Sequence, residues 1–176
     1  FDHRTTSMGY RINEPTHYVV EADRLPSYGY RAGRWLAELK NALAAGDYDA
    51  ILNVTLTDGG TSDISVSQLN EELITIKAAQ SVTYITDCSP TEDNIERAVK
   101  FAANSTLLII EAPFLEEDIE HAIEKNHLAL HLSKEIFWRS KSEFVRFTHF
   151  ASRYERESDR FFAKLYERMN GRVYTK

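Results

Sequence analysis

Three side chains that can bind metals or move protons come directly after apolar runs in the second half of the sequence. Asp87 follows the run VTYIT, Glu111 ends the run TLLIIE, and His149 follows FVRFT. Each run has the length and the β-branched or aromatic composition of a buried strand. Functional side chains collect where strands end and loops begin. One such residue is commonly a turn or cap residue, but three at consecutive strand ends indicate a site.

The histidines give weaker signals. His127 and His131 stand four residues apart in HLALH, a spacing that places both on one face of a helix, as in a metal-binding pair. The alternatives are that both histidines lie on a solvated helix face, or that one has a functional role and the other has none. His121 lies in an acidic helical stretch and is expected at the surface, and the role of His3 stays open.

The elements that must position these residues follow a regular order from about residue 82 onward. We expect strands at 82–86, 106–113 and 143–150, helices at 90–104, 116–126, 127–139 and 157–170, and a last short strand at 172–176. Earlier in the chain, strands are expected at 9–12 and 50–56 and a helix at 32–46. This order predicts an α/β layered fold with helices packed on a sheet. The sequence SPTE after Cys88 fits a capping box with Ser89 as the helix N-cap.

Length and composition set further bounds. The chain has 176 residues, 43% of them hydrophobic, which suits one domain over 1–176 with a sizeable core. Its net charge of −6 argues against a broad basic surface for nucleic acid, although not against a local phosphate site. The single cysteine, Cys88, excludes an internal disulfide. No apolar run reaches the length of a membrane span, so we expect a soluble cytoplasmic protein without membrane contact.

Four segments, taken in order, resemble ribonuclease Z and its relatives, which are hydrolases of the metallo-β-lactamase fold. The segments are YITD, LLIIEAPF, NHLAL and FTHFASRY, and the earlier FDHRTTSMGYRINEP and AGRWLAELKNAL are also similar to the family. The resemblance covers nearly the whole chain but corresponds only to the C-terminal half to two-thirds of a family member. It therefore implies the C-terminal half of a four-layer αββα sandwich.

The resemblance also implies roles for particular residues. Asp87 matches the aspartate that bridges two zinc ions, and His149 matches the last histidine ligand of the second ion. A carboxylate suits the bridging position because its two oxygens can each bind a cation. Within HLALH, the resemblance gives the useful role to His127 and makes His131 incidental.

Four more residues match positions that act on the substrate in the family. Glu111 and His127 match a relay that helps to protonate the leaving 3′ oxygen, although Ile110 stands where the family has a histidine. A carboxylate can fix the tautomer of an imidazole that titrates near neutrality. Ser152 and Arg153 match residues that contact a phosphate, for which a guanidinium fork is well suited.

The family's other metal ligands have no counterpart here. They come from an HxHxDH motif and one further histidine, and this chain contains no HxHxDH. Asp87 and His149 alone cannot complete two zinc sites. Three explanations remain: the C-terminal half of a longer hydrolase, a natural short relative that has lost catalysis, or a chain that pairs with itself or a partner. A homodimer is expected. Alone, it is expected to be inactive.

These observations favour a part of a zinc-dependent phosphodiesterase that resembles the endoribonuclease acting on tRNA precursors. The alternatives are a hydrolase of the same fold that acts on another ester, and a non-catalytic scaffold module. The long basic, glycine-rich arm that grips tRNA in bacterial members is not visible in the sequence. With an acidic pI of about 5.5 as well, tRNA processing is less firmly implied than phosphodiester hydrolysis.

Overall fold

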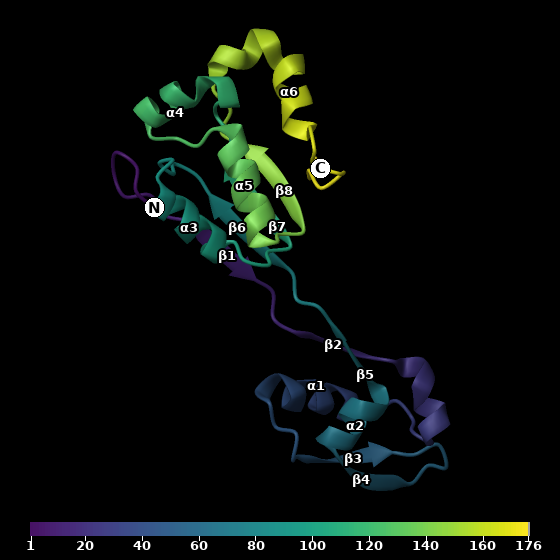
Figure 1. Cartoon of the computed structure of the whole chain (residues 1–176). Helices are drawn as coiled ribbons and strands as arrows, with labels where there is room; N and C mark the ends of the chain where they lie inside the picture. The colour runs from purple at the N-terminus through teal and green to yellow at the C-terminus, as the bar shows by residue number, and fades with distance from the viewer. Residues whose placement is uncertain (176) are drawn as a thin grey trace. The chain divides into compact units, whose positions relative to one another are not determined.

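The computed structural model describes residues 1–175 and divides the chain into two compact units (Figure 1). Unit 1 combines Phe1–Glu14 with the chain from Gln80 onward, and unit 2 is Pro15–Ala79. Each unit has its own cluster of buried hydrophobic residues. That residues 1–176 form one domain stays a prediction. Overall composition does not reveal the two units, because it does not show that the buried residues before and after residue 80 belong to different clusters.

Unit 1 is built on a four-stranded sheet with the order β1-β6-β7-β8. The strands are β1 (Tyr10–Asn13), β6 (Ser81–Ile85), β7 (Leu107–Glu111) and β8 (Phe144–Thr148). β6, β7 and β8 are parallel, and β1 pairs antiparallel with β6 at the edge. The predicted strands at 82–86, 106–113 and 143–150 thus form the parallel core, and parallel strands carry helices in their connections.

One face of this sheet is covered by helices α3 (Glu92–Phe101) and α5 (Leu130–Ser140) (Figure 1). The strand residues that face them are fully or almost fully buried: Ile85, Leu108, Ile110, Val145 and Phe147. The remaining helical elements of unit 1 are η2 (Glu116–Asp118), α4 (Ile119–Lys125), η3 (Ser152–Glu157) and α6 (Ser158–Tyr166). The mixed α/β architecture expected from the strand–helix order is therefore present.

The opposite face of the sheet is apolar apart from Arg146 of β8. Tyr10 and Ile12 on β1 are 56% and 70% exposed, and Tyr84 and Phe144 are 37% and 36% exposed. Because side chains alternate along a strand, these residues share one face, and the register aligns Tyr10 with Tyr84 across β1 and β6. Unit 1 therefore presents an apolar sheet face in the part of the chain that the structure describes.

Unit 2 contains two small antiparallel pairs and two helices. β2 (His17–Val20) pairs with β5 (Ile74–Lys77), and β3 (Ile51–Thr55) pairs with β4 (Thr61–Ser65). Between them lie η1 (Ala22–Tyr28), α1 (Trp35–Ala45) and α2 (Val66–Leu73). Leu39 and Leu43 of α1 and Leu69 and Leu73 of α2 are buried in one cluster. Sequence analysis predicted α1 and β3 but not the strands that follow the turn at 57–60.

Several local predictions were wrong. Helix α3 begins after Thr91, whose hydroxyl accepts a hydrogen bond from the Asn94 N–H at 3.3 Å, so Thr91 and not Ser89 is the N-cap. The expected strand at 172–176 is reduced, within the described residues, to one bridge between Val145 and Val173.

No described helix is long and apolar enough to cross a lipid bilayer.

Candidate metal and phosphate site

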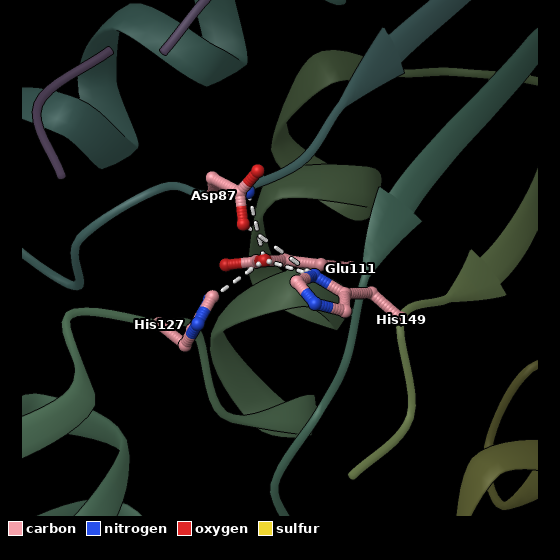
Figure 2. A group of neighbouring side chains, drawn as sticks. All are labelled: Asp87, Glu111, His127 and His149. Carbon is pink, nitrogen blue, oxygen red and sulfur yellow. Dashed lines mark hydrogen bonds and ion pairs between the residues drawn. The ribbon is translucent and has the colours of Figure 1, made fainter. Parts of the chain in front are cut away.

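Four polar side chains meet at one edge of the unit 1 sheet (Figure 2). Asp87 follows β6, Glu111 ends β7 and His149 follows β8 directly, so the parallel strands deliver all three to the same edge. His127 comes from the connection between α4 and α5. Each residue offers a nitrogen or oxygen atom, and these atoms all lie within 4.8 Å of one another.

Asp87 and His149 both have left-handed backbone conformations, with φ values of 53° and 59°. Non-glycine residues rarely adopt this region outside helix ends, and strained residues cluster at functional sites. Neither residue ends one of the described helices, in contrast to Asn126 and Lys141, which are the C-caps of α4 and α5. The turn after each strand therefore holds these two side chains in positions that an extended backbone would not give.

Glu111 organises the site because its buried carboxylate accepts hydrogen bonds from several donors. Oε1 accepts the backbone N–H groups of Cys88 at 3.2 Å and Leu128 at 3.0 Å. Oε2 accepts the Asp87 N–H at 2.9 Å and lies 3.0 and 3.1 Å from the Nδ1 atoms of His127 and His149. A carboxylate has about four acceptor positions, so this arrangement uses its acceptor capacity fully.

These contacts determine the charge of Glu111. Burial alone would raise the pKa, because it penalises the charged form. The hydrogen bonds from His127, His149 and the Leu128 N–H outweigh that effect and lower the pKa of Glu111 to about 2. The same bond to Glu111 raises the pKa of His149. Glu111 is therefore a carboxylate at neutral pH, fixed between two imidazoles.

The bonds to Glu111 also orient both rings. A neutral imidazole that donates from Nδ1 to a carboxylate presents Nε2 with a free lone pair, and this is the tautomer found in metal-binding and acid–base histidines. The ring centroids of His127 and His149 lie 5.0 Å apart with perpendicular planes. Glu111 thus fixes the orientation of two neighbouring imidazole rings.

The donor set fits a zinc ion at Asp87 and His149 more closely than at Glu111. The Asp87 and His149 side chains are neighbours, with an Asp87 carboxylate oxygen 3.7 Å from the His149 Nδ1, and both side chains are 44% exposed. Because Glu111 engages Nδ1, Nε2 is the His149 nitrogen that would bind an ion. Nitrogen and carboxylate oxygen are ordinary zinc ligands. Glu111 belongs to the same cluster, but its oxygens are already engaged by N–H donors, so it is suited to holding ligands rather than binding the ion.

A pocket of about 410 Å³ opens beside this cluster and is lined by His127, His149, Ser152 and Arg153, among others. The structure therefore brings Ser152 and Arg153 to the same place as the four clustered residues. The Arg153 guanidinium lies 3.4 Å from a carboxylate oxygen of Asp118, which helps to fix its position.

Sequence reasoning missed part of this pocket. His3, Arg4, His121 and Lys125 also line it. His121 was expected at the surface, and its side chain is 38% exposed there, but its place in the wall of this pocket was not predicted. The acidic residues around His121 gave no sign that this histidine lines a pocket. The position of His3 depends on contacts with residues far away in the sequence. The one signal available was the matching of FDHRTTSMGYRI to the family.

His131 lies elsewhere. Helix α5 begins at Leu130, after His127, so the two histidines do not share a helix face and form no metal pair. His131 instead lines a separate pocket with Lys134 and Trp138. The helix predicted at 127–139 starts late because Ala129 has an extended conformation at the N-cap.

Asn94 ties the start of the chain to this edge of the sheet. Its fully buried side chain donates to the carbonyls of Asp2 and Ser89 at 2.8 and 3.1 Å and accepts the Asp2 N–H at 3.1 Å. We expect Asn94→Ala to lower the free energy of unfolding of unit 1 by about 2–3 kcal/mol, because it leaves buried polar groups unpaired. Chemical denaturation measures this loss, and Glu92→Ala on the exposed side of α3 should change stability far less. Equal stability of Asn94→Ala and wild type would contradict the anchoring role.

Known proteins support the sequence resemblance. No protein-family profile matches the chain. A ribonuclease Z from Thermobifida fusca is 31% identical over 176 residues, which covers 98% of this chain and 48% of that protein. A ribonuclease Z from Nocardia farcinica is 28% identical over 157 residues, covering 89% of this chain and 45% of that protein.

Two solved structures match smaller parts of the chain. A long form RNase Z from yeast matches 43% of it with a TM-score of 0.38 and 25% identity. The short form of human tRNase Z matches 46% of it with a TM-score of 0.38 and 23% identity. The case for kinship rests on the two sequence matches, which cover 98% and 89% of this chain. The chain is a ribonuclease Z-like sequence that spans about half the length of the curated relatives it matches.

Proposed function

We propose that this chain supplies the C-terminal part of a metal-dependent phosphodiesterase site in a ribonuclease Z-like endonuclease that acts on tRNA precursors. The observation that carries the proposal is the convergence of Asp87, Glu111, His127 and His149 beside a pocket that contains Ser152 and Arg153. The names of the two curated relatives support the choice of RNA as the substrate.

Each residue then has a role that its surroundings allow. Asp87 and His149 would hold zinc, since a carboxylate and an imidazole are ordinary ligands of that ion. The bound metal would supply a nucleophile at neutral pH and neutralise charge on the phosphate. Arg153 would position the phosphate, with Ser152 beside it.

The pair Glu111 and His127 would act on the leaving group. Glu111 fixes the His127 ring through the 3.0 Å contact at Nδ1. This leaves Nε2 on the opposite side of the ring, where it can carry a proton toward a 3′ oxygen bound in the pocket. Among the described residues, only side chains at this edge combine a buried carboxylate with paired imidazoles.

Asp87 and His149 leave the coordination of two ions incomplete, since zinc takes four ligands. We propose that further ligands come from a second segment, which would be the other half of a family-length protein, a partner chain or a second copy of this chain. The apolar face that carries Tyr10, Ile12, Tyr84 and Phe144 supports this idea, because a second sheet packed on it would give the four-layer αββα sandwich.

Cleavage assays test the proposal. A polypeptide of the relatives' length that carries this sequence should cleave a tRNA precursor at its 3′ end and hydrolyse bis(p-nitrophenyl) phosphate more slowly. Residues 1–176 alone should do neither. Hydrolysis of the small diester without cleavage of the precursor would support the alternative of another ester substrate. If the polypeptide of the relatives' length shows neither activity and binds no zinc, that result would support a non-catalytic scaffold.

A further inference from the structure

Two of the described residues that line the pocket beside the clustered site are phenylalanines, and they differ in exposure. Phe114 is 6% exposed and packs against the rings of His121 and His127, with centroids 5.1 and 6.4 Å away. Phe150 is 40% exposed. A rigid apolar ring that stays open to solvent beside a ligand-sized pocket offers a surface on which a flat ligand group can stack.

Aromatic side chains of α6 support the Phe150 ring. Its centroid lies 5.1 Å from that of Phe161 and 5.8 Å from that of Phe162, with interplanar angles of 70° and 81°. Edge-to-face contacts of this kind are favourable between aromatic rings. Phe161 is itself only 2% exposed, and its ring packs 4.9 Å from that of Tyr154. A buried cluster therefore fixes the orientation of the exposed ring.

The backbone on both sides of Phe150 is fixed as well. His149, which precedes it, has the left-handed conformation described above, with φ of 59°. The N–H of Ala151, which follows it, donates to the Pro113 carbonyl at 3.3 Å. Phe150 therefore stands in a well-defined loop, directly after a proposed metal ligand and three residues before Arg153, the residue proposed to bind phosphate.

A ligand that uses this part of the pocket combines an anion with a flat group. The Arg153 side chain is 47% exposed and keeps guanidinium N–H donors that suit a phosphate. Aromatic side chains stack with the unpaired bases of single-stranded RNA, and each such contact contributes about 1–3 kcal/mol. A nucleotide carries both groups on one ribose, and a pocket of about 410 Å³ lies in the range that holds a ligand of that size.

We propose that Phe150 is a stacking platform for a nucleobase, which belongs to the nucleotide whose phosphate lies at Ser152 and Arg153. The inference rests on the proposed function, because that function supplies the phosphate. Since every base has a flat aromatic face, the platform accepts any of the four bases. It holds the RNA strand by a base as well as by a phosphate, and so presents one phosphodiester bond to the metal site.

Calorimetric titration of residues 1–176, without metal, tests the platform. Adenosine 5′-monophosphate should bind about tenfold more tightly than ribose 5-phosphate, which carries the same phosphate but no base. Phe150→Leu keeps an apolar side chain against α6 and should reduce this ratio to about threefold or less, whereas Phe150→Trp should preserve it. Tyr166→Ala is the matched control, because it removes a ring of α6 that is 48% exposed but lies outside this pocket. It should bind both ligands like wild type.

Three outcomes would overturn the proposal. They are the absence of any preference for the nucleotide in wild type, an unchanged ratio in Phe150→Leu, and an equal loss of the ratio in Tyr166→Ala. Arg153→Ala separates the platform from the proposed function, since it should weaken both ligands by the same factor and keep the ratio. If that variant binds both ligands normally while Phe150→Leu loses the ratio, the phosphate role of Arg153 fails and the platform stands.

Discussion

Glu111→Gln should lower the free energy of unfolding of unit 1 by about 3 kcal/mol or more. Glutamine has nearly the same shape, but its amide group would place N–H donors against the backbone and ring donors that now point at the carboxylate. Buried donors left without an acceptor cost about 1–3 kcal/mol each, and removing one partner of a buried charged network costs 3–5 kcal/mol. Hydrogen exchange measured by mass spectrometry tests this expectation. Amides of β7 should exchange faster in Glu111→Gln than in wild type, and amides of unit 2, which should be unchanged, serve as an internal reference.

The control for this substitution is Glu143→Gln, which removes an exposed carboxylate beside β8. It should leave the exchange of unit 1 unchanged within about 0.5 kcal/mol. Exchange in Glu111→Gln as slow as in Glu143→Gln would show that the carboxylate does not hold the site together. In a family-length protein, Glu111→Gln should also lower the cleavage rate by about 10²–10⁴-fold, because the tautomer of His127 is no longer fixed.

The same carboxylate gives a pH dependence. Its pKa is lowered from 4.5 to about 2, so the folded state binds fewer protons than the unfolded state between these values. The stabilisation, about 3 kcal/mol, is therefore complete above pH 4.5 and is lost progressively as the pH falls toward 2. Denaturation at a series of pH values should show this loss in wild type and a flatter curve in Glu111→Gln. The raised pKa of His149 acts in the opposite sense: its stabilisation is complete below the ordinary histidine pKa of 6.5 and is lost as the pH rises through the raised pKa.

Asp87→Asn should lower the cleavage activity of a family-length protein by about 10³-fold while changing its stability by less than about 1 kcal/mol. The Asp87 side chain is 44% exposed, so its loss leaves no buried group unpaired. Asparagine also tolerates the left-handed backbone at this position. The change removes one negative charge from the proposed metal site, and zinc content measured by atomic emission should fall in parallel.

Asp93→Asn provides the comparison for Asp87→Asn. Asp93 is an exposed aspartate of α3 that pairs with Arg97 at 3.1 Å on the helix surface. This variant should keep both zinc and activity. Full activity and zinc content in Asp87→Asn would remove Asp87 from the metal site, and a large loss of stability would mean that the side chain serves the fold instead.

The parallel core of unit 1 and its site edge were predictable from the sequence for a physical reason. Buried parallel strands are continuous apolar runs, and their polar ends stand out clearly, as at Asp87 and Glu111. The convergence of these ends follows from parallel pairing alone. The sequence could not show that Glu111 contacts both histidines, because that depends on where the connection after α4 places His127.

The predictions of helix starts and of short strands were wrong where the local sequence pattern did not match the backbone conformation. SPTE fits a capping box that begins at Ser89, but the helix is capped two residues later by Thr91, whose backbone is extended with φ −86° and ψ 149°. HLALH has helical spacing, but Asn126 ends α4 with a left-handed turn, and α5 begins only at Leu130. In unit 2, β2 and β5 were not predicted; each has only four residues, which gives little periodic pattern.

The way unit 2 joins unit 1 has a consequence for how this protein can vary. The chain leaves the sheet after β1 and returns into β6, and these antiparallel neighbours meet at Asn13 and Ser81. The Glu14 N–H still donates to the Gln80 carbonyl at 2.8 Å. For the sheet, Pro15–Ala79 is therefore equivalent to a hairpin loop, and the entropy of closing a loop grows only with the logarithm of its length. Evolution or design can lengthen, exchange or delete this insertion at one end of β6 without moving Asp87, which lies beyond the other end.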